Sequence, residues 1–358
     1  MELHQILRFA VTHGFSDVHL TVGRKPYFRK DGALVYQKGS PDVDSAHMES
    51  WCDQLLTEES SATLQRARSV DASFELDEVG RFRISAYYQR GHLAVALRHV
   101  PRTVPSLDAL GLPDVLKTIA MKPRGIILVT GATGSGKSTT MAAMIQEINR
   151  QATRHILTIE DPIEYVFEEA NSIVSQREVG VDAPSFSNAL RAALRQDPDV
   201  LYIGELRDME TTEVALHAAE TGHLVLSTMH TMDVVETVHR FISLFPPYQQ
   251  PLVRRQLSSV LTAVITQRLV ETIDGGRTPA CEIMVQTELI RELVADESRT
   301  YELRDALAKG RGAYATQTFD QALGALVQEG RIDRDVAMRH ARNPSDMRLA
   351  FDGIGSID

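Results

Sequence analysis

The segment Gly131–Ser138 constrains this chain more than any other. It reads Gly-Ala-Thr-Gly-Ser-Gly-Lys-Ser and satisfies the pattern GxxxxGK[ST] at every defined position. The apolar run 126–129 precedes it, and a helix-forming stretch, 139–148, follows it. Glycines let a backbone wrap closely around phosphate and point its N–H groups inward, and a helix N-terminus adds a favourable dipole. The segment therefore predicts a phosphate-binding loop between a strand and a helix.

The residue types within this loop indicate their roles. Lys137 is expected to contact the β- and γ-phosphates of ATP, and the Ser138 hydroxyl is expected to hold Mg²⁺. A glycine-rich turn that binds no nucleotide is the alternative, and the complete motif in its strand–helix context disfavours it. We predict that the nucleotide is bound by Gly131, Ala132, Thr133, Gly134, Ser135, Gly136, Lys137, Ser138 and Thr139.

A second apolar strand, predicted over 200–203, is followed by Gly204 and Glu205. Ligands of open α/β sheets bind where the strands reach their carboxyl ends, so Glu205 is expected near the phosphates. A Walker B strand usually ends in Asp, and here Gly204 holds that place. Glu205 is therefore the candidate catalytic acid, acting on the attacking water or as a ligand of Mg²⁺.

Two further segments carry candidate catalytic residues at strand ends. Glu160 and Glu164 belong to the run Glu-Asp-Pro-Ile-Glu, which follows a predicted strand over 155–159. His223 and His230 flank another apolar segment, and a histidine beside a γ-phosphate can sense or polarise it. Both segments have a structural alternative, because Asp-Pro is typical of turns and a lone histidine is more often structural.

The first hundred residues predict a small α/β domain. Residues 1–13 form an amphipathic helix pattern, and two short strands flank Asp31-Gly32, which is a strong hairpin signal. A helix is predicted over 44–65, and two strands are predicted over 81–87 and 93–100.

The pattern changes after this domain. Prolines punctuate residues 101–113, which we predict to be a linker between domain 1–100 and domain 114–358. In the second domain apolar strands alternate with helices, which predicts a mostly parallel sheet. Its tail, from about residue 288, is predicted to be helical and charged.

The composition narrows the class of protein. The 358 residues carry a formal net charge of -10, whereas nucleic-acid binders usually present a basic face. The two cysteines, Cys52 and Cys281, form no CxxC pair, which excludes a four-cysteine zinc site and favours reduced thiols. No signal peptide is visible, and no apolar run approaches the ~20 residues that span a bilayer. We therefore predict a cytoplasmic protein that reaches a membrane only through partners.

Together these segments resemble the type II/IV secretion-system ATPase family, and within it the type IV pilus retraction ATPases (PilT-type), over nearly the whole chain. Glu160–Glu164 resembles the family's Asp box, Gly204-Glu205 its variant Walker B, and His223 with His230 its His box. Ser16–Leu20 resembles a signature near the start of the family's N-terminal PAS-like domain. The resemblance implies a PAS-like α+β domain followed by a RecA-like P-loop domain, assembled into a hexameric ring.

The resemblance also implies two arginine fingers. Arg83 and Arg98 lie on the late strands of the N-terminal domain, where the family places these arginines, and the nucleotide would sit between the two domains. An arginine that stabilises charge on the transferring phosphoryl group can raise the rate by ~10³–10⁵. Without the resemblance both would be interpreted as solvated strand residues. Arg81, on the same side of its strand as Arg83, is the nearest competitor.

Two features favour retraction over pilus assembly or type II secretion. Assembly and secretion ATPases resemble one another in having an extra N-terminal domain and a four-cysteine zinc insertion, whereas this chain begins at the PAS-like domain and lacks the cysteines. The stretch Glu288–Leu293 keeps only part of a helix pattern of the retraction ATPases, although 318–323 resembles the family. An accessory retraction paralogue therefore stays an alternative.

The resulting prediction is a homohexameric ATPase, with Mg²⁺ as cofactor, that powers pilus retraction and twitching motility at the cytoplasmic face of the inner membrane. The implied partners are a platform protein in that membrane and paralogous pilus ATPases. Neither nucleic acid nor insertion into the membrane is expected. Two other classes stay open: a RecA-like nucleic-acid motor, and an interaction subunit that binds nucleotide without turning it over.

Overall fold

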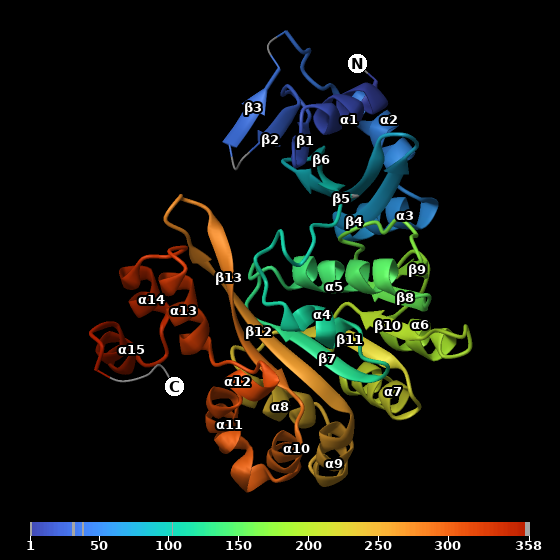
Figure 1. Ribbon diagram of the computed structural model, residues 1–358. Coiled ribbons are helices and arrows are strands. Elements are labelled where there is room, and N and C mark those ends of the chain that lie inside the picture. The colour runs from blue at the N-terminus through green and yellow to red at the C-terminus, as the bar shows by residue number, and fades with distance from the viewer. Residues whose placement is uncertain (1, 31–32, 38, 102, 355–358) are drawn as a thin grey trace. The chain divides into compact units, whose positions relative to one another are not determined.

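The computed structural model describes residues 2–30, 33–37, 39–101 and 103–354 (Figure 1). The chain divides into two compact units. The N-terminal unit comprises Met1–Thr103 with Pro162–Val166, and the C-terminal unit comprises Val104–Asp161 with Phe167–Asp358. The division after Thr103 falls inside the segment 101–113 that we predicted as a linker. The assignment of residues 162–166 to the N-terminal unit has no counterpart in the sequence analysis.

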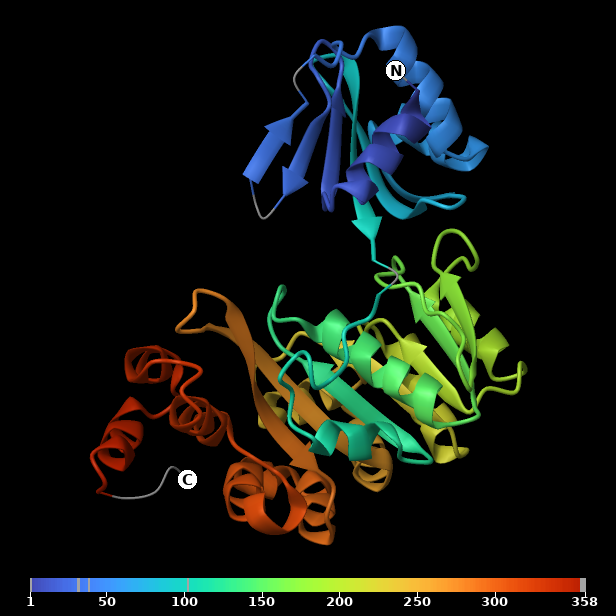
Figure 2. The ribbon, with the colours of Figure 1, turned by 45° about the horizontal axis from the view of Figure 1, so that its top comes forward.

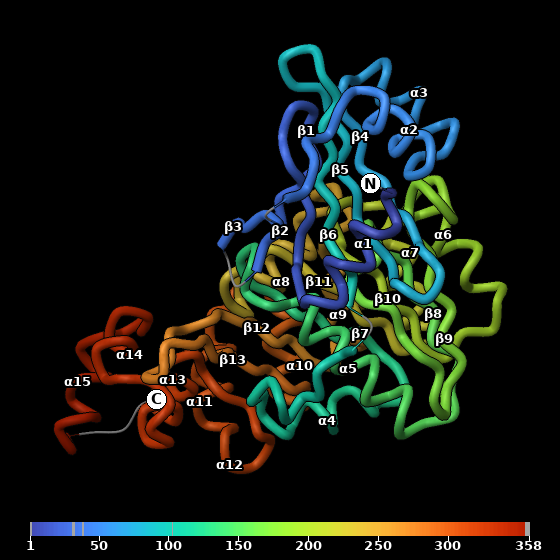
Figure 3. Tube along the Cα trace, turned by 90° about the horizontal axis from the view of Figure 1, so that it is seen from above, coloured from blue at the N-terminus to red at the C-terminus, as the bar shows by residue number. Residues whose placement is uncertain are grey.

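The N-terminal unit is built on a six-stranded antiparallel sheet with the order β3-β2-β1-β6-β5-β4, whose labels can be followed in Figure 3. Its core combines strand residues such as Phe82 and Leu97 with residues of three helices. Burial alternates along β5, so Phe82 faces the core and Arg83 faces the other way. The elements are α1 (Leu3–Thr12), β1 (Asp17–Thr21), β2 (Tyr27–Lys30), β3 (Ala33–Tyr36), α2 (Ser45–Leu55), α3 (Glu58–Ala67), β4 (Ser69–Leu76), β5 (Gly80–Gln89) and β6 (His92–Val100).

The prediction of one helix over 44–65 is wrong, because two helices occupy this segment. Leu56 has an extended backbone, with φ -112° and ψ 142°, and this ends α2. The Thr57 side chain then accepts a hydrogen bond from Ser60 N at 3.2 Å and caps α3. Such a cap satisfies one of the free N–H groups at a helix start, so it favours a new helix over continuation of the old one.

The hairpin around Asp31-Gly32 is confirmed in its strands. β2 and β3 pair in antiparallel register from Tyr27 opposite Tyr36 to Lys30 opposite Ala33. Asp31 and Gly32 themselves lie outside the described residues. Strand β4, which pairs with β5 along its full length, was not predicted.

The C-terminal unit contains a seven-stranded sheet with the order β13-β12-β7-β11-β10-β8-β9. Neighbouring strands are parallel except at the antiparallel pair β12 and β13. The predicted fold class, a small α+β domain followed by a domain with a mostly parallel sheet, is confirmed. The strands are β7 (Gly125–Thr130), β8 (His155–Glu160), β9 (Ile173–Glu178), β10 (Val200–Ile203), β11 (Leu224–Met229), β12 (Leu261–Glu271) and β13 (Arg277–Val285).

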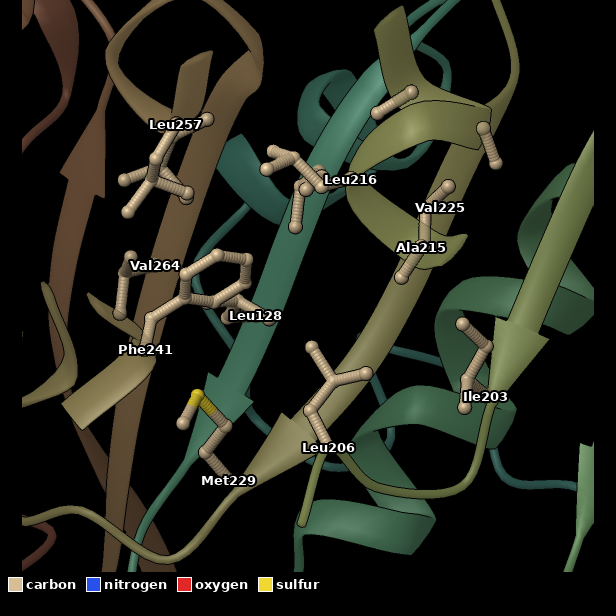
Figure 4. Close-up of a cluster of buried hydrophobic side chains, with 14 of the residues drawn as sticks. Leu128, Ile203, Leu206, Ala215, Leu216, Val225, Met229, Phe241, Leu257 and Val264 are labelled. Carbon is tan, nitrogen blue, oxygen red and sulfur yellow. The ribbon is translucent and has the colours of Figure 1, made fainter. Parts of the chain in front are cut away.

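Helices cover both faces of this sheet (Figures 1 and 2). Figure 4 shows the core on one face, where Phe241 and Leu257 of the helices lie close to Leu128 and Val264 of the sheet. Every residue of β7, β10 and β11 is buried, as expected for parallel strands covered on both sides. The helices are α4 (Val115–Ala120), α5 (Lys137–Gln151), α6 (Phe186–Ala193), α7 (Met209–Glu220), α8 (Val234–Ser243) and α9 (Gln250–Val260).

The tail after β13 is helical, as predicted from about residue 288. Phe319 and Leu323 of this tail pack against Val270 of β12 and Ala280 of β13. Among the described residues, no helix combines the length and the apolar character needed to cross a bilayer. The tail consists of α10 (Glu288–Ala295), a 3-10 helix (Glu297–Glu302), α11 (Leu303–Lys309), α12 (Arg311–Tyr314), α13 (Phe319–Gln328), α14 (Arg334–His340) and α15 (Pro344–Phe351).

Candidate active site

Four neighbouring parallel strands of the C-terminal unit, β7, β11, β10 and β8, reach their carboxyl ends at the same edge of the sheet. Gly131 follows β7, His230 follows β11, Glu205 follows β10 after Gly204, and Glu160 is the last residue of β8. This is the edge at which open α/β sheets bind their ligands. The structure therefore brings the predicted phosphate loop, both strand-end acids and one of the two histidines to one edge.

The loop after β7 encloses the ammonium group of Lys137 in a tight backbone turn. Gly131 and Gly136 have φ of 143° and 90°, a region that residues with a Cβ rarely adopt. The Lys137 Nζ donates hydrogen bonds to the carbonyl oxygens of Gly131 at 2.8 Å and Ala132 at 2.9 Å. Burial lowers the pKa of the Lys137 ammonium. The loop thus surrounds a positive charge that has little contact with solvent.

Two observations indicate that a phosphate group fits this loop. The Ser135 hydroxyl is buried and, within the described part of the chain, forms no hydrogen bond. A buried hydroxyl without a partner is unfavourable, and a phosphate oxygen would provide that partner. The loop also leads directly into α5, a helix of 15 residues whose N-terminal N–H groups and dipole favour an anion.

Glu205 lies in a charged cluster at the end of β10. Arg207 Nη2 donates to Glu205 Oε2 at 2.9 Å, and His230 Nε2 lies 3.3 Å from the same oxygen. Burial lowers the pKa of His230, and the charges of Lys137 and Arg207 lower it further. His230 is therefore mostly neutral at pH 7. Arg207 was not among the predicted site residues. The sequence indicates it only by its position two residues after Glu205.

The two acids of the segment 160–164 lie in different surroundings. The Glu160 side chain is buried at the sheet edge, where it accepts hydrogen bonds from Thr158 Oγ1 at 2.7 Å and Gln176 Nε2 at 3.1 Å. Glu164 belongs to the N-terminal unit, where its Oε1 accepts a hydrogen bond from Arg83 Nη1 at 2.9 Å. A shared role for both carboxylates, as the sequence suggested, does not follow from this arrangement.

Arg83 and Arg98 are directly opposite one another on β5 and β6. Opposed residues of an antiparallel pair point to the same face of the sheet. Asp17 of β1 lies opposite Arg98 in turn, and Arg98 Nε donates to Asp17 Oδ1 at 2.8 Å. Burial alone would raise the pKa of Asp17, but hydrogen bonds from Ser16 and Arg98 and the Arg98 charge lower it overall. Both predicted arginines are therefore held by carboxylates on one sheet face.

The structure does not bring His223 to the phosphate loop. His223 precedes β11, so it lies at the amino edge of the sheet, where its carbonyl oxygen accepts a hydrogen bond from Gly125 N. At the usual rise of a strand, its backbone is about 20 Å from that of His230. Its Nδ1 is 2.9 Å from Ala218 O. Of the two predicted histidines, His230 therefore lies at the carboxyl edge of the sheet with the phosphate loop, and His223 lies at the opposite edge.

The oxygen atoms at the loop edge suit Mg²⁺, which prefers oxygen ligands. The Ser138 hydroxyl follows Lys137 in the first turn of α5, and the carboxylates of Glu205 and Glu160 lie at the carboxyl ends of the neighbouring strands β10 and β8. No cluster of three or more His, Cys, Asp or Glu side chains that could hold a metal ion occurs within the described ranges. Mg²⁺ commonly needs only one or two protein oxygens when phosphates and water supply the rest, so these residues fit it.

Comparison with known proteins agrees with this geometry. The family described as "Type II/IV secretion system protein" matches residues 2–353. The type IV pilus retraction ATPase PilT of Pseudomonas aeruginosa is 40% identical over 346 residues, which cover 97% of this chain and 100% of the relative. The type IV pilus ATPase PilU of the same organism is 38% identical over 350 residues, covering 98% and 91%.

Solved structures show the same architecture. A crystal structure of the pilus retraction motor PilT with bound ADP superposes with a TM-score of 0.87 at 44% identity, covering 96% of this chain and 98% of that one. The Legionella pneumophila ATPase DotB superposes with a TM-score of 0.82 at 28% identity, covering 98% and 95%. With a P-loop, a strand-end acid and a nearly full-length match to this family, the chain belongs to the type II/IV secretion system ATPases.

Proposed function

We propose that this chain is the ATP-hydrolysing subunit of a motor that retracts type IV pili. The supporting observation is that Lys137, Glu205 and His230 lie at one sheet edge in a chain that is 40% identical, over 97% of its length, to a relative named for pilus retraction.

Binding of ATP begins at the P-loop. The loop carbonyl oxygens that now accept hydrogen bonds from Lys137 would be replaced by β- and γ-phosphate oxygens, which are stronger acceptors because they are charged. Ser135 Oγ would donate to a phosphate oxygen, and the amides of the loop and of the first turn of α5 would do the same. Low exposure of Lys137 strengthens each of these interactions, since water screens them little.

Hydrolysis requires an acceptor for the proton of the attacking water. Glu205 accepts this proton, while the water oxygen forms a bond to the γ-phosphorus and the bond from that phosphorus to the bridging oxygen of ADP breaks. Arg207 and His230 hold the Glu205 carboxylate in position through the contacts described above. His230 is mostly neutral, so it can exchange its hydrogen bond between Glu205 and a γ-phosphate oxygen without a change of charge.

Mg²⁺ would be held by Ser138 and supported by Glu205 or Glu160, and it would neutralise charge on the phosphates. Arg83 and Arg98 would supply further positive charge to the transferring phosphoryl group. Within the N-terminal unit Glu164 holds Arg83, and Asp17 holds Arg98. His223, at the amino edge of the sheet, couples phosphate loss to movement rather than contacting the nucleotide of its own chain.

Six copies in a ring would pass this cycle from subunit to subunit and turn a platform protein in the inner membrane from its cytoplasmic face. A count of surface pili, with an assay of surface motility, after deletion of the gene in its host tests the proposal. Excess pili with lost motility are expected. Motility should return with the wild-type gene and with Glu213→Gln, an exposed carboxylate of α7, but not with Glu205→Gln. Cells without pili would instead identify an assembly motor.

A second candidate is an accessory retraction ATPase that works beside a paralogue. The specific observation in its favour is the 38% identity to PilU over 98% of this chain, which is close to the value for PilT. Unchanged piliation after deletion, combined with a stronger defect when a paralogous gene is also deleted, would select this candidate. Stimulation of ATP hydrolysis by DNA would support a nucleic-acid motor instead.

A further inference from the structure

Strand β12 places one polar side chain directly against the P-loop. β12 runs parallel to β7, and its residue Thr266 pairs with Thr130, the last residue of β7. Gln267 is the next residue along β12, so it lies beside the start of the loop. Its side chain is 2% exposed, although an amide is a strongly polar group. A buried amide needs hydrogen-bond partners, and here both partners belong to the loop and its helix.

The Gln267 amide connects the middle of the loop to the first turn of α5. Its Nε2 donates a hydrogen bond to Ser135 O at 2.8 Å, and its Oε1 accepts one from Thr140 Oγ1 at 2.7 Å. The backbone carbonyl can only accept, which fixes the NH₂ group toward Ser135 and leaves the oxygen for Thr140. One side chain from a different strand thus joins the loop at Ser135 to α5 at Thr140, five residues further along the chain.

Two glycines of the loop lie close to Gln267. A Cβ on Gly131 would lie 2.4 Å from the Gln267 carbonyl oxygen, and a Cβ on Gly136 would lie 2.8 Å from Gln267 Nε2. Real Cβ atoms essentially never come this close to another heavy atom. The backbone of β12 therefore requires a glycine at 131, and a side chain at 136 would displace the Gln267 amide; both glycines also have positive φ angles.

The contact with Ser135 O also orients a loop amide. A peptide group is planar and trans, so its C=O and N–H point in opposite directions. When Gln267 draws Ser135 O toward β12, the N–H of Gly136 points away from β12. Without this hydrogen bond the Ser135–Gly136 peptide could rotate and present its carbonyl dipole where an anion binds, which is unfavourable for phosphate.

We propose that Gln267 is a positioning residue of the nucleotide site: it fixes the Ser135–Gly136 peptide so that the loop presents N–H groups to a phosphate. The proposal rests on the nucleotide-binding role given to the loop above. Gln267 does not touch the nucleotide itself, and its effect is carried by the loop backbone. Its loss weakens nucleotide binding by more than it weakens the fold.

The substitution Gln267→Glu tests this idea through its dependence on pH. A carboxylate cannot donate to Ser135 O, whereas a protonated carboxyl group can donate to Ser135 O and still accept from Thr140. Burial raises the pKa of a carboxyl group, which brings its protonation within a measurable pH range. We expect the Kd for ADP to rise about 10-fold or more at pH 8.5 and to return toward the wild-type value at pH 6.

A matched control separates a role in binding from a role in stability. Gln286 Nε2 donates to Ser258 O at 3.0 Å, which is the same kind of hydrogen bond at a site away from the loop. Gln286→Glu should lower the Tm of the nucleotide-free protein without a pH-dependent loss of ADP affinity. Thr140→Val removes the other partner of Gln267 and should weaken ADP binding about threefold. The double variant Gln267→Glu with Thr140→Val should bind little worse than Gln267→Glu alone at pH 8.5.

The measurements are calorimetric titration of ADP and thermal unfolding, each from pH 6 to 8.5 on the full chain. Wild-type affinity of Gln267→Glu at pH 8.5, or a loss that is the same at every pH, would overturn the proposal. If Gln267→Glu does not fold, Thr140→Val decides, and unchanged ADP affinity in that variant overturns the proposal. Failure of the wild-type protein itself to bind ADP would refute the proposed function instead, whatever the variants do.

Discussion

The two sheets of this chain carry their candidate functional residues in different places. In the C-terminal sheet the strands β7, β10 and β11 are buried throughout, and the loop glycines, Glu205 and His230 all follow strand ends. In the N-terminal sheet burial alternates along β5, and Arg83 and Arg98 project from the middle of their strands. The candidate residues of the C-terminal unit therefore lie at an edge of its sheet, and those of the N-terminal unit lie on a face of its sheet.

The difference follows from how each sheet is covered. A parallel sheet with helices on both faces has no free face, so polar groups can gather only where the strands end. An antiparallel sheet with one core face can present charged side chains along the other, and opposed pairs lie about 4.5–5.5 Å apart. Hence an acid after an apolar strand can be recognised in the sequence, but an arginine within a strand can be recognised only when its face is known.

The largest expected effect is on kcat, and it concerns the two arginines on the face of the N-terminal sheet. If Arg83 and Arg98 act on the transferring phosphoryl group, Arg83→Ala and Arg98→Ala should each lower kcat by about 10³-fold or more, with little change in ADP affinity. Arg→Lys should not rescue, because a lysine lacks the planar guanidinium. Steady-state ATPase assays and ADP titrations measure both quantities. Arg81→Ala, on the same strand face, serves as the control, and an equal loss there would mean that the face acts only through its net charge.

The next effect concerns the strand-end acid. Glu205→Gln keeps the shape of the side chain and removes its ability to accept a proton, so kcat should fall by about 10²–10⁴-fold while ADP still binds. Glu213→Gln makes the same change at an exposed position of α7 and should leave kcat near the wild-type value. Turnover of Glu205→Gln at the wild-type rate would show that the catalytic acid lies elsewhere, and Glu160 would be the first to examine.

A smaller effect is expected on the free energy of unfolding, which depends on how well a side chain is packed in each unit. Phe241 is fully buried in the core of Figure 4, so Phe241→Ala should destabilise the C-terminal unit by about 3–5 kcal/mol. Leu34 of the N-terminal sheet is 52% exposed, and Leu34→Ala should change stability by less than about 0.5 kcal/mol. Denaturant unfolding gives both values. A loss of more than about 1 kcal/mol at Leu34 would mean that this side chain is covered in the folded state.

The smallest expected effect is on the protonation of His230. Burial and the charges of Lys137 and Arg207 keep its pKa below the ordinary value, so an NMR titration should find its midpoint below about 6.5. Lys137→Met removes one positive charge and should raise this pKa, because the protonated form then meets less repulsion. A fall in the His230 pKa would contradict the assigned electrostatics.

Much of the C-terminal site could be predicted from local sequence. The P-loop, the strand 200–203 with Glu205 behind it, and the alternation of strands and helices all depend on residues close together in the chain. The helix boundary at Leu56 and Thr57 was missed, because it depends on the extended backbone of Leu56 and on the cap that the Thr57 side chain provides. The strands β12 and β13 were also missed, and with them Gln267, whose partners lie more than a hundred residues away in sequence.

The sequence by itself determined the chemistry of this protein: a phosphate loop, an acid after an apolar strand, and a division into two folding units. These features are local, because backbone freedom at glycine and the hydrophobic period of a strand act over a few residues. The tertiary structure decided which groups meet. It separated His223 from His230 by the length of a strand, paired Arg83 with Glu164 and Arg98 with Asp17, and set Gln267 against the loop. Strand order and register bring such groups together, and neither is written in the spacing of residues along the chain.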